Sequence, residues 1–164
     1  MPESLRTRLE RHAFNLVPAY RGTGARIRYI ASDWREVHVE LALSWRTRNV
    51  VGTIFGGSMY GAVDPVYMVM LMRNLGRGYQ VWDKAAAIRF RRPGRGRLTA
   101  RFVLEEAELA AIRGALESTR SIDRIYEVAL TDRSGEVCAR VEKTLHVRRI
   151  AAAEAIHSES CAAT

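Results

Sequence analysis

The sequence contains little cysteine and little histidine. Only two cysteines occur among its 164 residues, Cys138 and Cys161, and its four histidines lie far apart. So few cysteines exclude a disulfide framework and a cysteine-based metal site. The histidines have no metal-ligand spacing. We therefore expect neither a metal nor a resident cofactor.

Several familiar signals are also missing. The chain has no G-x-S-x-G elbow, no Walker loop and no Rossmann fingerprint. It begins MPESLRTRLER, without the apolar core of a signal peptide, which predicts a cytoplasmic location. Residues 54–72 are long enough and apolar enough to suggest a membrane span. Asp64 and Pro65 lie at the centre of that run, and a central Asp costs about 2.5–3.5 kcal/mol on insertion. We therefore expect no membrane span.

Positive charge is abundant. Lys and Arg number 26 against 18 Asp and Glu, a net charge of +8, while 48% of the residues are hydrophobic and 27% are charged. These fractions are typical of one globular domain. The charge favours an anionic partner, which could be nucleic acid, a membrane surface or a phosphorylated small ligand. No helix-turn-helix, zinc pattern or aromatic-rich strand accompanies it, so we expect no nucleic-acid partner.

The hydrophobic periodicity predicts an α+β fold in which a curved antiparallel sheet wraps a long central helix. A single domain is expected over residues 1–149, with an N-terminal helix, followed by a flexible C-terminal tail over 150–164. The predicted order is helix 5–16, strands 26–31 and 35–43, apolar helix 56–75, strands 85–91 and 97–104, helix 107–117, and strands 122–130 and 137–147.

Two glycines open the apolar helix. Gly56 and Gly57 leave unpaired backbone N–H groups at a helix N-terminus, where the helix dipole is positive. Such amides can stabilise an oxyanion. The alternative is that the Gly-Gly pair simply makes a tight turn.

An acidic residue follows on the same helix face. Asp64 lies seven residues, or about 10 Å, beyond Gly57, and Tyr60 and Tyr67 share or flank that face. It is a candidate catalytic carboxylate, or else part of an Asp-Pro helix kink. At this separation one chain cannot easily bring both groups to one carbonyl, whereas two chains could. A site of this kind would require a dimer.

A basic turn lies between two later strands. Arg91, Arg92 and Arg95 stand within it, and arginine forks match phosphate oxygens. They are candidate phosphate-binding residues. The alternative is a solvated turn with no ligand.

The spacing of Asn49, Phe55-Gly56-Gly57 and Asp64 resembles the signature of hotdog-fold acyl thioesterases of the phenylacetate-degradation type. In that family an Asn precedes a His-Gly-Gly by six residues, and the catalytic Asp follows the His by nine. The turn that begins at Phe90 also resembles the family's strand-ending turn. One departure is clear, because Phe55 stands where the family has histidine.

The resemblance implies a homodimer, often paired into a tetramer, that cleaves acyl-coenzyme A. By that likeness the Gly57 amide polarises the thioester carbonyl, and Asp64 from the partner subunit activates water or attacks directly. Asn49 positions the water or the carboxylate. Asp83 occupies the place of a small hydroxyl residue that orients water in some members. Phe55 in the histidine position would alter carbonyl binding or substrate choice.

Three functions therefore stand as hypotheses. The first is hydrolysis of an acyl-coenzyme A or acyl-carrier-protein thioester, with coenzyme A present only as part of the substrate. The second is a non-catalytic acyl-coenzyme A or lipid binder on the same scaffold, which Phe55 favours. The third, a nucleic-acid-associated protein, is supported only by the charge.

Overall fold

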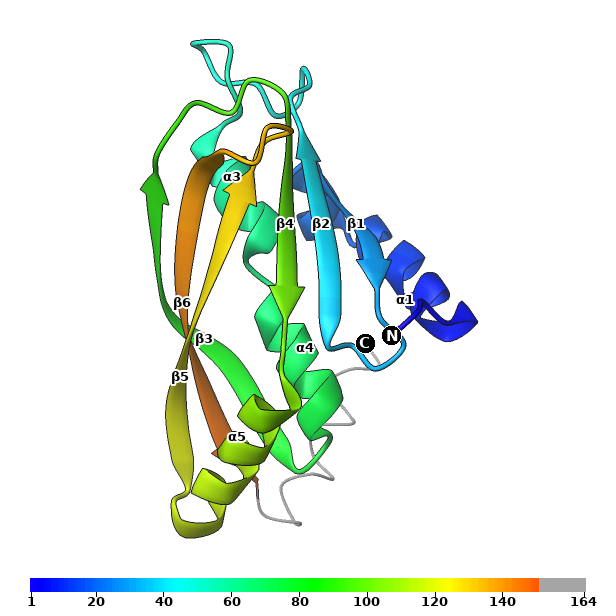
Figure 1. Ribbon diagram of the computed structural model, residues 1–164, viewed down its shortest axis with the longest axis vertical. Coiled ribbons are helices and arrows are strands. Elements are labelled where there is room, and N and C mark those ends of the chain that lie inside the picture. The colour runs from blue at the N-terminus through cyan, green and yellow to red at the C-terminus, as the bar shows by residue number, and fades with distance from the viewer. Residues whose placement is uncertain (151–164) are drawn as a thin grey trace.

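In the computed structural model, which describes residues 1–150, a six-stranded antiparallel sheet wraps a central helix (Figure 1). The strands run in the order β1-β2-β4-β5-β6-β3. The predicted tail over 150–164 lies outside the described residues except for Ile150. The elements are α1 (Leu5–Leu16), α2 (Pro18–Gly22), β1 (Ala25–Ile30), β2 (Glu36–Ala42), α3 (Gly56–Val63), α4 (Val66–Leu75), β3 (Tyr79–Phe90), β4 (Arg97–Val103), α5 (Glu106–Ser118), β5 (Ser121–Thr131) and β6 (Val137–Arg149).

The order of elements is the one that the periodicity predicts, with three differences. A short helix, α2, follows α1, because Pro18 is favourable at the first position of a helix as well as being a terminator of the preceding one. Strand β3 begins at Tyr79 instead of Ala85. The long helix is interrupted where α3 ends and α4 begins. These differences leave the predicted α+β architecture intact.

The interruption lies at Asp64 and Pro65. Proline has no backbone N–H, so the carbonyl one turn earlier loses its helical partner. The torsions of Asp64 (φ −50°, ψ −55°) and Pro65 (φ −82°, ψ −9°) nevertheless stay in the right-handed region. The chain therefore continues as a second helix, and the break is local.

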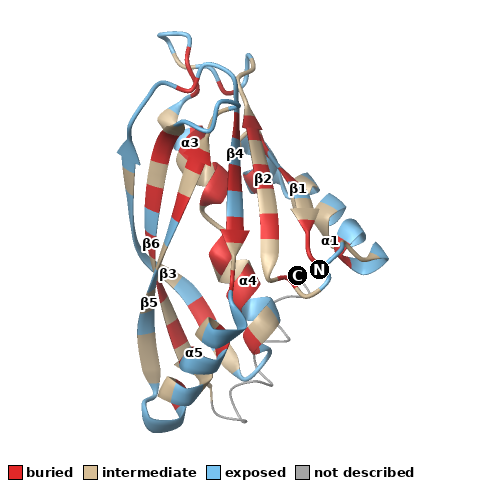
Figure 2. Cartoon of the chain, in the orientation of Figure 1, coloured by how far each residue is buried: buried red, intermediate tan, exposed pale blue. Residues whose placement is uncertain are grey.

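The core lies between the central helices and the inner face of the sheet, where the buried segments of Figure 2 gather. Alternate residues of each strand point inward, as the period of two requires. The buried members include Met59, Ala62, Val66, Met70 and Leu71 from the helices, and Val37, Val39, Leu41, Leu98, Phe102, Leu130, Val141, Leu145 and Val147 from the strands.

The two edge strands of the sheet, β1 and β3, differ in what covers them. Helix α1 lies against the β1 edge, where the side chain of Asn15 exchanges two hydrogen bonds with the backbone of Ile27. At the other edge, β3 is paired with β6 on one side only, and most of its residues from Lys84 onward are exposed. Within residues 1–150 the outer side of β3 has no strand beside it.

Candidate active site

Three charged side chains meet where the central helix breaks. Lys143 on β6 places its Nζ atom 2.5 Å from Oδ1 of Asp64 and 2.7 Å from Oδ1 of Asp83, which lies on β3. The same Nζ donates a hydrogen bond to the backbone carbonyl of Asp64, at 2.8 Å. Two acidic residues predicted as site residues are therefore brought together by a cation between them.

The cluster is buried on one side and open on the other. The Lys143 side chain is 1% exposed, whereas those of Asp64 and Asp83 are 39% and 28% exposed. Burial opposes the charge on Lys143, but the hydrogen bonds and ion pairs with the two carboxylates outweigh it and raise its pKa above the ordinary value. The lysine thus stays protonated and holds both carboxylates by their inner oxygens.

Sequence reasoning missed Lys143, although a signal was present. Residues 137, 139, 141, 143, 145 and 147 of the last strand share one face, and all but Lys143 are apolar. A single charged residue on an inward-facing stripe requires a buried counter-ion. That requirement could have linked β6 to the acidic residues of the helix and of β3.

Tyr60 completes the surroundings of Asp64. Its ring lies 5.5 Å from the Nζ atom of Lys143. Burial and a hydrogen bond to Asp64 raise the pKa of the Tyr60 hydroxyl, so it remains a donor to the carboxylate. Tyr60 therefore lies beside Asp64, on the helix face that the two residues share; its role in substrate binding stays a prediction.

Tyr67 lies elsewhere. Its side chain is 7% exposed, and its ring stacks on Tyr126 with centroids 4.7 Å apart. The edge of the ring also meets Phe102, at 5.0 Å. Tyr67, which the helical spacing places with Tyr60 on or beside the Asp64 face and which is a candidate substrate-binding residue, thus belongs to a buried aromatic cluster of the core.

The N-terminus of α3 has no side-chain cap, as the two-glycine start suggests. Two exposed phenyl rings cover the glycines: a Cβ on Gly57 would lie 2.3 Å from the ring of Phe55, and one on Gly56 would lie 2.7 Å from the ring of Phe90. A side chain at either position would therefore collide with a ring. The two glycines allow the rings of Phe55 and Phe90 to pack directly against the backbone at the start of α3. Phe55 and Phe90 are 57% and 56% exposed.

Asn49 organises the loop that leads to this helix. Its Oδ1 accepts hydrogen bonds from the backbone N–H groups of Val51 and Thr53, at 3.1 and 3.0 Å, and its Nδ2 donates to Thr53 Oγ1, at 3.0 Å. One Nδ2 hydrogen is left for another acceptor, because an amide carries two.

The loop and the basic turn border an open cavity of about 380 Å³. Asn49, Gly56, Phe90, Arg91 and Arg92 are among the residues that line it. The structure thus brings four predicted site residues, two of them arginines, beside the start of α3.

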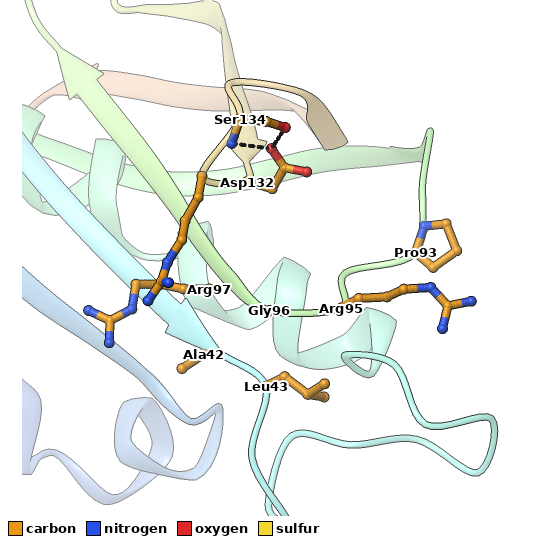
Figure 3. A pocket seen from close by; sticks show the side chains of 9 residues that line it. Ala42, Leu43, Pro93, Arg95, Gly96, Arg97, Asp132 and Ser134 are labelled. Atoms are coloured by element: carbon orange, nitrogen blue, oxygen red, sulfur yellow. Dashed lines mark hydrogen bonds between the residues drawn. The ribbon is translucent and has the colours of Figure 1, made fainter.

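Arg95 lies at a different opening, of about 610 Å³, shown in Figure 3. Its side chain extends along the β3–β4 turn, away from Asp132 in the neighbouring hairpin. Further along, Arg97 and Arg101 form ion pairs with Glu40 and Glu36, both at 2.6 Å. The arginines between residues 91 and 101 therefore do not form one cluster: some line one of two separate cavities, and others form ion pairs on the sheet.

The predicted residues form two groups in one chain. Asn49, Gly56, Arg91 and Arg92 gather at the start of α3, and Asp64, Asp83 and Tyr60 gather at its end. The intervening helix separates the groups by about 10 Å. Among residues 1–150, no group of three or more His, Cys, Asp or Glu side chains could hold a metal ion. No helix in that same part of the chain is long and apolar enough to cross a membrane.

The chain belongs to a family described as "Domain of unknown function (DUF4442)", whose model matches residues 6–147. No curated protein matches it. Several solved structures do. One is a Pseudomonas aeruginosa protein of unknown function whose description adds "Probable Thioesterase", with a TM-score of 0.79 and 20% identity over 92% of this chain and 99% of that one.

Two further structures carry the name thioesterase. One from Haemophilus influenzae has a TM-score of 0.62 and 16% identity, covering 84% of this chain and 87% of that one. One from Pseudomonas aeruginosa has a TM-score of 0.65 and 13% identity, covering 87% and 94%. At these identities the likeness establishes the fold, which is the hotdog fold of these thioesterase structures.

Proposed function

We propose that this DUF4442 protein is a hydrolase of acyl-coenzyme A or acyl-carrier-protein thioesters, of the phenylacetate-degradation type. One observation carries the proposal: Asp64 and Asp83 flank a buried lysine and keep part of each carboxylate accessible. A structural ion pair needs only one carboxylate for one lysine. The second acidic residue adds negative charge beside the helix break. The family resemblance in the spacing of Asn49, Phe55 and Asp64 implies that the reacting carboxylate is Asp64, at this same position.

The chemistry follows from these groups. Lys143, through Oδ1, and Tyr60 hold Asp64 in one orientation, and the exposed part of the carboxylate can accept a proton from water. The resulting hydroxide adds to the thioester carbonyl, and helix N-terminal amides stabilise the negative oxygen. Collapse breaks the carbon–sulfur bond, and the proton held by Asp64 passes to the thiolate. The products are a carboxylic acid and a free thiol.

The site requires two chains, because about 10 Å of helix separates Asp64 from the Gly57 amide. The open edge of β3 supports a homodimer, since an unpaired strand can bind a second copy by backbone hydrogen bonds. Asp83 lies on that strand, so pairing there would bring the acidic cluster to the interface. Val50, Val51, Phe55 and Phe90 are exposed near the start of α3 and would gain cover from a partner or an acyl chain. A dimer of dimers is the further assembly that the family resemblance implies.

The phosphates of coenzyme A would meet the basic cavity. Arg91 and Arg92 line it beside Gly56, and Arg92 is held by Glu136, at 3.0 Å. Arginine suits phosphate because its fork offers paired donors. Arg95 would contact the ligand only beyond this cavity, at the adjacent opening.

A second function is favoured by Phe55. Its ring lies against Gly57, the residue whose amide would polarise the carbonyl, and no histidine is present at that position. A protein of this kind would bind acyl-coenzyme A or lipid without cleaving it.

Thiol release from a panel of acyl-coenzyme A esters tests the proposal. We expect release by the wild-type protein and a loss of about 100-fold or more in Asp64→Asn, because the general base is removed. Asp123→Asn is the matched control: Asp123 is also paired with a lysine, Lys84, at 2.5 Å, but lies outside the cluster.

The outcomes separate the hypotheses. Equal activity in Asp64→Asn and the wild-type protein would contradict the proposed mechanism. Tight binding of acyl-coenzyme A without thiol release would favour the binder. Base-specific binding of duplex DNA at physiological salt would count against both acyl functions.

A further inference from the structure

The N-terminal helix turns its leucines to solvent. Leu5, Leu9 and Leu16 lie at helical spacing on one face of α1 and are 74%, 63% and 66% exposed. The opposite face carries Thr7, which is buried. An amphipathic helix on a globular domain normally packs its apolar face inward. In α1 the arrangement is largely reversed: the three leucines face solvent, and Phe14 is the large apolar side chain of this helix that packs against the core.

The reversal has a physical cause. Strand β1 is a sheet edge whose backbone groups need partners. Asn15 supplies an acceptor and a donor to the N–H and carbonyl of Ile27, at 2.8 and 2.9 Å, and Glu3 accepts from the N–H of Ile30, at 3.3 Å. The face of α1 that carries Asn15 and Phe14 therefore packs against the sheet edge and the core, and the leucines on the opposite face point to solvent.

Basic residues surround this leucine face. Arg6 and Arg8 flank it on α1; they form ion pairs with Glu10 and Glu3, at 3.2 and 3.7 Å, but their side chains stay 80% and 61% exposed. Beside it runs a groove of about 690 Å³ that shares His12 and Leu16 with the helix. The other side of the groove carries Arg21, Arg26, Arg46 and Trp45, and none of the described residues that line it is acidic. Trp45 is 82% exposed.

We propose that the leucine face of α1 and the adjacent groove form a docking surface for an anionic lipid bilayer. Leucines inserted at the headgroup boundary, arginines on both sides and a neighbouring exposed tryptophan are the features of an interfacial helix. The charge selects this occupant over a second copy of the chain. A two-fold contact through this face would set its arginines against one another. The surface is separate from the acidic cluster, so the inference does not depend on the proposed hydrolysis.

Co-sedimentation of the full chain with vesicles tests the proposal. We expect binding to phosphatidylcholine vesicles that contain about one-third phosphatidylglycerol, little binding to phosphatidylcholine alone, and weakening by salt. Leu9→Ser with Leu16→Ser should weaken binding roughly tenfold or more, because two apolar side chains no longer insert. Arg26→Glu with Arg46→Glu should weaken it as well. Ile125→Ser is the control, since Ile125 is 66% exposed on β5, away from α1.

Tryptophan fluorescence gives a second readout. A blue shift on adding anionic vesicles should disappear in Trp45→Phe, because Trp45 is exposed and lines the groove, whereas Trp34, which donates a hydrogen bond to Glu10 of α1, is already buried. Failure of the wild-type protein to bind anionic vesicles overturns the proposal. So does retained binding in the leucine variant, which would indicate electrostatic adsorption alone. If the leucine substitutions lower the molar mass of the protein in solution, the leucine face mediates self-association and the proposal is wrong. If inorganic phosphate fully displaces the protein from the vesicles, the surface is a phosphate site and the proposal is also wrong.

Discussion

At the residue scale, Lys143 joins three elements through one buried charge. Its side chain is almost fully buried, and its charge is balanced by carboxylates from two other elements, the helix break and β3. A buried cation with partners costs little net free energy, whereas the same cation without partners costs several kcal/mol. The acidic residues therefore contribute to folding as well as to the proposed chemistry.

Removal of both carboxylates should expose this dependence. We expect Asp64→Asn combined with Asp83→Asn to lower the free energy of unfolding by about 3–5 kcal/mol, because the ammonium is left buried without a counter-ion. Urea denaturation measures the loss. In a Lys143→Met background the same pair of substitutions should cost much less. An equal loss of stability in both backgrounds would show that the two carboxylates do not stabilise the protein through Lys143.

The pH dependence of stability follows from the same lysine. The folded-state pKa of Lys143 lies above its ordinary value of 10.5. Its contribution is therefore fully present below that value and is lost as pH rises through the folded pKa. We expect the wild-type protein to lose more stability than Lys143→Met between about pH 9 and about pH 12. Parallel denaturation curves for the two proteins across that range would contradict this expectation.

At the element scale, α1 protects the sheet edge through Asn15. This one side chain makes two hydrogen bonds to the backbone of Ile27. The edge of β1 is thereby covered, while among residues 1–150 no strand pairs with the outer side of β3. The difference explains why only one end of the sheet is suited to pairing with a second copy.

Loss of the Asn15 side chain should loosen this contact. We expect Asn15→Ala to lower the free energy of unfolding by about 1–3 kcal/mol, because a backbone donor and an acceptor lose their partners. Amide hydrogen exchange at Ile27 should accelerate in step. Leu16→Ala, on the exposed side of the same helix, is the control and should change stability by less than about 0.5 kcal/mol. A larger effect in the control would place the stabilising contact elsewhere.

At the scale of the whole molecule, the proposed site depends on pairing through β3. In an antiparallel contact about a two-fold axis, a residue near the axis lies close to its own copy, so a new positive charge in the middle of β3 repels its own copy. We expect Ala85→Lys, at an exposed position opposite Thr144 and not opposite Lys143, to shift the protein from dimer toward monomer in light scattering and to reduce thiol release in parallel. Ala111→Lys adds the same charge on the exposed surface of α5 and should do neither. An unchanged dimer in Ala85→Lys would place the interface outside β3.

Much of the architecture could be predicted because hydrophobic periodicity is a local property. The alternation around Val37 and Val141 and the apolar run before Leu75 indicate strands and a helix without reference to distant contacts. The helical spacing pointed to Asp64, and the family resemblance to Asp83, as candidate site residues. The sequence by itself therefore determined most of the order of the elements, the α+β hotdog architecture and two acidic candidates for the site.

The tertiary structure decided the partners. Lys143 lies 79 residues from Asp64 along the chain, and only the pairing of β3 with β6 brings it between the two carboxylates. The leucines of α1 form a regular stripe, but their direction depends on the edge strand that recruits the polar face. Tyr67 lies in the core for a similar reason. Periodicity shows that an element has two faces, whereas packing among distant elements determines what each face meets, because burial is a property of the assembled layers.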